Sequence, residues 1–322
     1  MRGIELDNLL SVSSSPHIRS GGTTQRIMLD VLLALIPATA AGVYFFGPRT
    51  LLVIGVTVLA CLCFEYLTRR LLKRSNTLSD LSAAVTGLLL ALNLSPTIPL
   101  WMAVIGAFFA IVIVKQLYGG IGQNFVNPAL AARVILLVAY GARMTDWVAP
   151  FSGTGADAIS QATPLSVLKE GGVLPQLSQM FLGLKGGSIG ETSALALLIG
   201  GAYLIVRGVI SWHIPVVYIG TVGVFSWVLG TNGLFTGEPF YQMLAGGLML
   251  GAIFMATDYT TSPMTRKGVL IYAFGCGLLT VVFRNYTNLP EGVSYAILLM
   301  NIVTPLIDRY TLPKRFGGDV RV

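Results

Sequence analysis

Hydrophobic residues along this chain of 322 residues form long blocks separated by short polar connections. A membrane-spanning helix needs about 20 mostly apolar residues. By that measure the blocks predict helices at 28–47, 50–68, 79–94, 98–117, 128–145, 191–208, 213–230, 240–257, 268–284 and 292–308. The longer polar stretches are the N-terminal residues 1–27 and the connection 146–190. The pattern therefore predicts an all-α membrane protein with about ten transmembrane helices.

The composition supports this interpretation and excludes other classes of protein. Hydrophobic residues make up 54% of the chain and charged residues only 11%, whereas a soluble domain carries about 25% charged residues. A soluble globule, a disordered chain and a nucleic-acid-binding protein are therefore excluded. Cys61 and Cys63 are two apart on a predicted helix and Cys276 lies in another apolar block. Their spacing fits neither a zinc nor an iron–sulfur site.

The positions of lysine and arginine predict the orientation in the membrane. Placing the N-terminus in the cytoplasm puts 15 of the 21 Lys and Arg residues inside, five outside and Arg133 within the fifth helix. Cytoplasmic loops carry an excess of these residues, so we expect both termini in the cytoplasm and the loop 146–190 outside. Residues 1–27 lack the apolar core of a signal peptide, so we expect the first helix to stay in the mature protein.

The two halves of the chain resemble each other weakly. Gly87-Leu-Leu-Leu is followed by Ser95-Pro96, and Gly247-Leu-Met-Leu by Ser262-Pro263, at an offset of about 160 residues. Asn127-Pro128 similarly parallels Leu289-Pro290. Five helices per half is an odd number, so the halves would be inverted relative to each other, as in many transporters. The predicted parts are a cytoplasmic tail 1–27, repeats 28–145 and 191–308, the outer loop 146–190 and a cytoplasmic tail 309–322.

The outer loop contains a candidate site for a cofactor. By composition, the stretch from Asp157 to Leu165 is an ordinary loop of small residues with a hydroxyl before a proline. It resembles the flavinylation motif, Asp-x-x-Ser/Thr-x-Ala-Thr, of the RnfD and NqrB membrane subunits, with Gln161 in place of the usual Gly. In that family a flavin transferase moves FMN from FAD onto the threonine hydroxyl. The resemblance implies a phosphoester-bound FMN, and it implies these motif residues: Asp157, Ser160, Ala162 and Thr163.

A glycine-rich run before the predicted fifth helix is a second candidate site. It reads Gly-Gly-Ile-Gly-Gln-Asn-Phe-Val-Asn-Pro-Ala and places Asn124 and Asn127 three residues apart. Glycine lets the backbone approach a ligand closely, but a helix cap with a re-entrant turn explains the same pattern. The run is similar to the corresponding run of the RnfD and NqrB family. That resemblance implies a second, non-covalent flavin, riboflavin, at Asn124 and Asn127.

The stretch Ala256–Thr265 is a third candidate, because it offers oxygen atoms at a helix end. Thr257 and Asp258 are hard ligands that suit a small cation, although a capped helix end with a solvated aspartate explains them equally well. The stretch resembles the Ala-Thr-Asp…Thr-Ser-Pro motif of the same family.

Four ionisable residues fall at or within the predicted helices, where charge is costly and suggests a function. Arg133 lies deepest and could pair with a carboxylate or approach a flavin phosphate. The others lie near the inner helix ends: Asp30, Glu65 and Asp80.

The resemblance to the family extends from Ser20 to Arg309, and the Ala162-Thr163-Pro164-Leu165 sequence and the short N-terminus favour its RnfD branch. It implies an Rnf subunit in a bacterial or archaeal cytoplasmic membrane that helps couple ferredoxin:NAD electron transfer to Na⁺ or H⁺ transport. The implied partners are other membrane and peripheral Rnf subunits, the flavin transferase and lipid. No nucleic-acid partner and no catalytic residue is expected. No NAD site is expected either, because no Gly-x-Gly-x-x-Gly follows a strand.

Two other functions remain open at this point. One is a small-solute channel or transporter of the inverted-repeat type without flavin, because fold does not settle function. The other is a structural anchor for redox subunits.

Overall fold

The computed structural model describes residues 22–152, 161–170, 172, 174–230, 233–287 and 291–313. The described chain is mostly helical, in agreement with the all-α prediction apart from one short antiparallel hairpin. Its strands are β1 (Leu229–Gly230) and β2 (Gly233–Leu234).

The first part of the chain contains six α-helices and two short helices of other types. They are α1 (Thr24–Phe46), α2 (Pro48–Leu71), the 3₁₀-helix η2 (Leu78–Asp80), α3 (Ser82–Leu92), α4 (Leu100–Phe108), the π-helix η3 (Phe109–Gln116), α5 (Pro128–Ala139) and α6 (Gly141–Met144).

In its described residues, the loop that follows contains two short helices that the sequence did not predict. These are α7 (Pro164–Glu170) and α8 (Leu177–Leu182). The second part of the chain then forms α9 (Ala194–Val206), α10 (His213–Val228), α11 (Pro239–Leu244), α12 (Leu248–Leu250), the π-helix η4 (Gly251–Met255), α13 (Arg266–Tyr286) and α14 (Gly292–Thr311).

Each of the ten predicted ranges contains helix, but several are shorter or broken. The range 128–145 divides at Tyr140 into α5 and α6, and 240–257 divides into α11, α12 and η4.

Two sequence features explain many of the boundaries. Proline stands at the first position of α2, α5 and α11, where its missing N–H costs nothing. The hydroxyls of Thr23 and Thr265 accept hydrogen bonds from the first turns of α1 and α13.

Three of the described helices, α1, α2 and α13, are long and apolar enough to cross a membrane. Five further apolar helices of 10–17 residues accompany them: Ser82–Leu92, Leu100–Gln116, Pro128–Ala139, Ala194–Val206 and His213–Val228. Many large apolar side chains on these helices are exposed, such as Leu52, Leu59 and Val206. A soluble protein would bury most of this surface, so the helices indicate an integral membrane protein.

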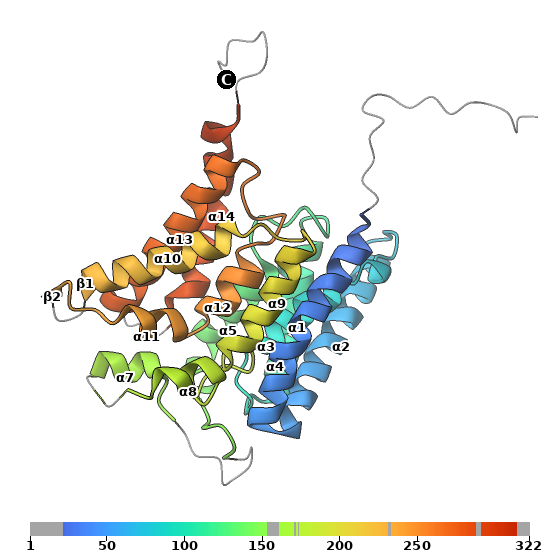
Figure 1. Cartoon of the computed structure of the whole chain (residues 1–322). Helices are drawn as coiled ribbons and strands as arrows, with labels where there is room; N and C mark the ends of the chain where they lie inside the picture. Colours follow the sequence, from blue (N-terminus) through green and yellow to red (C-terminus); the bar gives the residue numbers. More distant parts are fainter. Residues whose placement is uncertain are drawn as a thin grey trace, which may run out of the picture.

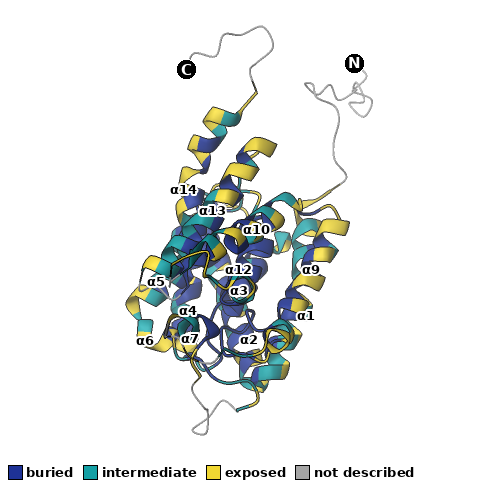
Figure 2. Cartoon of the chain, turned by 60° about the vertical axis from the view of Figure 1, so that its left-hand side comes forward, coloured by how far each residue is buried: buried dark blue, intermediate teal, exposed yellow. Residues whose placement is uncertain are grey.

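Short helices lie at the centre of the bundle, with the long helices around them. In Figure 2 the ribbons of α3 and α12 are coloured as buried and the outer faces of the surrounding helices as exposed. Each central helix is followed by a non-helical segment, residues 93–99 after α3 and residues 256–265 after η4. Loop backbone fills the first break, since Gly190 N donates to Leu92 O at 2.8 Å. Such pairing is what allows irregular backbone inside a membrane protein.

The two ends of the described chain lie at the same end of the molecule. In Figure 1 the start of α1 and the end of α14 are at the top, while the turn between α1 and α2 and the helices α7 and α8 are at the bottom. The outer-loop helices are therefore on the opposite side from both ends of the described chain.

Candidate functional site

Thr163 is the residue immediately before α7, and its hydroxyl caps that helix. Its Oγ1 accepts a hydrogen bond from Ser166 N and donates to Ser166 Oγ, both at 3.3 Å. Only 7% of Thr163 is exposed. The stretch that its composition marks as an ordinary loop therefore ends in a helix, and Thr163 is buried at the start of that helix. Ala162 is exposed, and the other motif residues, Asp157 and Ser160, lie outside the described residues.

The segment that carries Thr163 is attached to the body at three points. Gln161 N donates to Trp147 O at 2.9 Å. Leu165 of α7 is buried in a small cluster with Met180 of α8 and Ala245 after α11. Near the end of α7, Lys169 Nζ donates to Thr287 O at 2.8 Å. Thr163 thus lies at the start of a short helix that rests on α8, α11 and the end of α13.

Buried cations hold the surface on which α7 rests. Arg284 donates to Gln242 O at 2.5 Å and to Ala245 O at 2.9 Å, and Lys185 donates to Leu244 O. These carbonyls end α11, where a positive charge is favourable. Burial lowers the pKa of Lys185, in the loop before α9, to about 8.

The glycine-rich run forms a tight loop that leads into α5. Gly119, Gly120 and Gly122 have φ angles of 129°, 105° and 86°, which other residues rarely adopt. Asn127 is the cap of α5, because its Oδ1 accepts from Ala129 N at 3.1 Å and from Leu130 N at 3.2 Å. The helix-cap interpretation therefore holds for Asn127. Its Nδ2 also donates to Met255 O at 3.3 Å, which connects α5 to η4.

The second and third candidate sites are parts of one site. Asn124 Nδ2 donates to Thr260 Oγ1 at 3.0 Å, and Thr260 Oγ1 donates to Asp258 Oδ2 at the same distance. Asp258 also accepts from Thr261, so its carboxylate caps the turn after η4. Thr257 donates back to Ile253 O at 2.7 Å. The sequence did not indicate this junction, since 136 positions separate Asn124 from Thr260.

A cavity of about 400 Å³ opens beside this junction, between α1, α3, the loop before α5 and the end of η4. Its volume is in the range of small-molecule sites, which are mostly apolar with a few placed polar groups. Apolar walls come from residues such as Ile27, Val85 and Phe254. The polar groups on its wall include Ser82, Lys115, Asn124, Asn127, Asp258 and Thr260. Because α1 contributes its first turns, the cavity lies at the same end of the molecule as the chain ends (Figure 1).

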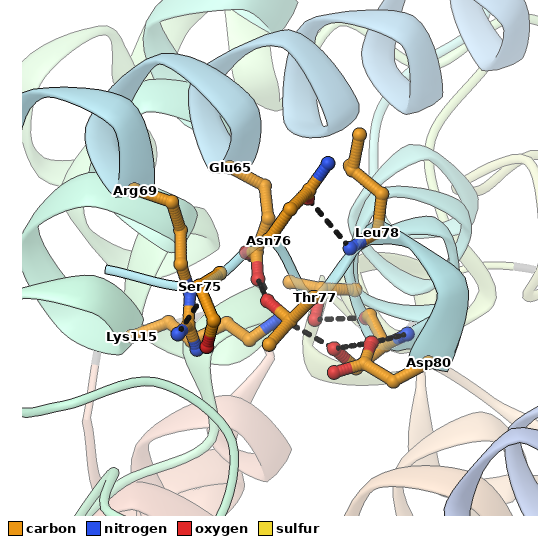
Figure 3. A network of polar contacts seen from close by, with 10 residues as sticks. Glu65, Arg69, Ser75, Asn76, Thr77, Leu78, Asp80 and Lys115 are labelled. Carbon is orange, nitrogen blue, oxygen red and sulfur yellow. Dashed lines mark hydrogen bonds and ion pairs between the residues drawn. The ribbon is translucent and has the colours of Figure 1, made fainter. Parts of the chain in front are cut away.

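A buried ion pair forms part of the cavity wall. Lys115 Nζ lies 3.1 Å from Glu65 Oε2 and donates to Ser82 Oγ at 2.7 Å. Thr77 donates to Glu65 Oε1 at 2.8 Å (Figure 3). The sequence singled out Glu65 but not Lys115, although an isolated lysine within the apolar block 98–117 was the available signal. A buried charge needs such a partner.

Arg133 pairs with a carboxylate, which was one of the two roles that the sequence left open for it. It forms an ion pair with Glu291, the residue before α14, and donates to Asn93 Oδ1 at 2.5 Å. Asn93 follows α3, so the contact joins the central helix, α5 and α14. Glu291 was missed in the sequence, where it stands just before the tenth apolar block.

Asp30 on α1 also has partners. Its carboxylate accepts a hydrogen bond from the Tyr203 hydroxyl on α9 at 2.8 Å and one from Arg207, the residue after α9, at 3.3 Å.

Comparison with known proteins covers almost the whole chain. Residues 11–317 match the model of the NQR2, RnfD, RnfE family. One subunit of the Na⁺-translocating ferredoxin:NAD⁺ oxidoreductase complex of Acetobacterium woodii is 49% identical over 313 residues, 96% of this chain and 95% of that protein. The corresponding subunit of the proton-translocating ferredoxin:NAD⁺ oxidoreductase complex of Clostridium ljungdahlii is 48% identical, over 96% of this chain and 97% of that one.

A more distant relative agrees. The corresponding subunit of the ion-translocating oxidoreductase complex of Stutzerimonas stutzeri is 41% identical over 93% of this chain and 94% of its own. The matches confirm the resemblance that the loop motifs indicated, and the chain belongs to the NQR2, RnfD, RnfE family.

Proposed function

We propose that this chain is RnfD, the membrane electron-transfer subunit of an Rnf complex, with FMN bound covalently to Thr163. In this role it passes electrons between flavins and helps couple ferredoxin:NAD electron transfer to the transport of Na⁺ or H⁺. The observation that carries the proposal is the Ala-Thr-Pro-Leu sequence of the outer loop, placed at the end of the molecule opposite the cavity (Figure 1).

The covalent attachment needs one hydroxyl and one donor of the flavin. The Thr163 oxygen forms a bond to the phosphorus of the FMN half of FAD, the bond from that phosphorus to the AMP oxygen breaks, and AMP and the hydroxyl proton leave. The product is a phosphoester that adds negative charge to the loop. When bound, the flavin supplies one- and two-electron transfer, and the tether keeps it at the outer end of the protein.

The residues present fit a second, non-covalent flavin in the cavity. A flavin ring needs apolar walls for its faces and amide-like partners for its edge. Asn124 presents a carboxamide at the wall, held by Thr260. Asn127 positions the adjacent start of α5 and lines the same cavity. We assign this cavity to riboflavin, with Asn124 as the residue that contacts it.

The two flavin positions suggest a path for electrons across the membrane. Ten transmembrane segments in two inverted five-helix repeats, 28–145 and 191–308, would place the broken helices α3 and α12 at the repeat interface. Both termini are then cytoplasmic, the cavity lies on the cytoplasmic side and Thr163 outside. The excess of Lys and Arg that the sequence assigns to the side of both termini supports this orientation.

The partners follow from the same assignment. Other Rnf subunits contact the chain within the membrane and at its surfaces, a flavin transferase matures it, and lipid covers the exposed apolar helix faces. The alternative function, a small-solute channel or transporter, is favoured by the cavity alone and leaves Thr163 unmodified.

Expression with and without a flavin transferase tests the proposal. The native chain should show ultraviolet fluorescence in a denaturing gel and an intact mass larger by one FMN moiety only with the transferase. Thr163→Val, which keeps the side-chain shape and removes the hydroxyl, should lack both signals. The control is Thr145→Val, which removes the hydroxyl of an exposed residue directly after α6. A native chain without covalent flavin after co-expression would refute the proposal and favour the transporter.

A further inference from the structure

Thr163, whose hydroxyl we assign as the flavin acceptor, is buried, and that hydroxyl already forms hydrogen bonds. Thr163 is 7% exposed, and its Oγ1 makes two hydrogen bonds with Ser166 in the first turn of α7. Ser166 Oγ also donates to Thr163 O at 2.8 Å. The backbone of the next turn depends on the same residue, because Val167 N donates to Thr163 O at 3.0 Å. In this arrangement the hydroxyl caps α7 and is occupied by hydrogen bonds to Ser166.

Phosphoryl transfer requires a different environment for this oxygen. The attacking oxygen, the phosphorus and the leaving oxygen must lie roughly in line, so the hydroxyl must enter the active site of a second protein that holds FAD. The hydrogen bonds at the start of α7 hold the Thr163 hydroxyl against the first turn of its own helix. A transferase cannot bring a dinucleotide in line with a capping hydroxyl in that position.

The attachment of α7 is limited enough to open. The cluster of Leu165, Met180 and Ala245 is separate from the main core. The hydrogen bond from Lys169 to Thr287 is exposed to solvent. The buried residues that the structure describes in this short element are confined to its start, Thr163 to Leu165, and Leu165 anchors it in that cluster. Such an element belongs to the low-stability part of a fold, which opens locally without global unfolding.

From these observations we propose that the flavin transferase acts on an opened form of residues 161–170, in which α7 has left α8 and α11. The proposal rests on the assignment of Thr163 as the flavin acceptor. The partner therefore recognises this segment as an extended chain, and the stability of the α7 contact controls the rate of modification.

The rate of flavin transfer to purified full-length apoprotein tests this. Apoprotein made without transferase is incubated with purified transferase and FAD, and covalent flavin is followed by gel fluorescence and intact mass. If α7 opens and closes faster than the transferase reacts, the rate of flavin transfer is proportional to the fraction of molecules with α7 open. Leu165→Ala removes the buried anchor and should speed modification at least about tenfold. The matched control is Leu182→Ala, an exposed leucine of α8, which should leave the rate unchanged.

A cross-link that prevents α7 from opening provides the opposite test. Lys169→Cys and Thr287→Cys place two thiols across the contact between α7 and α13, in a chain with Cys63→Ala because Cys63 is exposed and Cys61 and Cys276 are buried. Closing this contact with a bifunctional thiol reagent before the transferase is added should abolish modification. The same reagent added after modification should leave the flavin in place, and a monofunctional reagent should leave the rate unchanged.

Equal rates for cross-linked and open protein would overturn the proposal, and so would a Leu165→Ala variant that is modified at the native rate. Failure of the underlying assignment gives a different result. In that case neither the native chain nor Leu165→Ala acquires flavin above the level of Thr163→Val.

Discussion

The ion pair between Arg133 and Glu291 joins parts of the chain that are far apart in sequence, and its removal should destabilise the protein strongly. Arg133→Met keeps most of the side-chain volume but removes both the charge and the hydrogen bond to Asn93. It leaves the Glu291 carboxylate, 8% exposed, without its cation. An uncompensated buried charge is costly, whereas replacing both members of a buried pair by neutral groups is often nearly neutral.

The expected magnitude follows from this difference. Breaking a buried pair costs about 3–5 kcal/mol. At about 2 °C per kcal/mol for a chain of this size, the apparent Tm should fall by roughly 6–10 °C. The double variant Arg133→Met with Glu291→Gln should recover more than half of that loss. Arg143→Met is the control, because Arg143 is exposed and exposed charges contribute little.

The buried cysteines provide the assay. Cys61 and Cys276 are fully buried, so a dye that fluoresces on reaction with thiols reports unfolding in detergent, in a Cys63→Ala background. Additive losses in the two single variants, with no recovery in the double variant, would refute the reasoning. So would an Arg133→Met variant with the Tm of Arg143→Met, since that result would mean that the pair carries no coupling.

Three further predictions concern the cavity and the orientation. Asn124→Ala should remove the non-covalent flavin from denatured extracts and leave the gel fluorescence from Thr163 intact. The control variant Gln123→Ala, which changes an exposed neighbour, should retain both flavins. Retention of both flavins by Asn124→Ala would contradict the cavity assignment. Asp258→Asn should weaken Na⁺- or H⁺-coupled transport in vesicles more than ferredoxin:NAD electron transfer, because it removes charge from the oxygen-rich turn; equal loss of both activities, or of neither, favours a capping role alone. A cysteine at Gly153 should react with a membrane-impermeant reagent in intact cells, and labelling only after the cells are opened would reverse the proposed orientation.

Much of the local structure followed from the sequence. Apolar blocks located helix in every predicted range, because burial and chain periodicity act over neighbouring residues. Local chemistry also marked individual positions, such as the start of α5 at Asn127-Pro128. The motifs of the outer loop and of the glycine-rich run identified the family, which the matches over residues 11–317 confirmed.

Only the tertiary structure decided which distant residues meet. The hydrogen bonds from Asn124 to Thr260 and from Arg133 to Asn93, and the ion pair of Lys115 with Glu65, join positions 136, 40 and 50 residues apart. A one-dimensional pattern contains no signal for such pairs, because they depend on how helices break and cross. The burial of Thr163 has the same origin. A hydroxyl before a proline predicts a turn, but the packing of Leu165 on Met180 and Ala245 places that turn against the body of the protein.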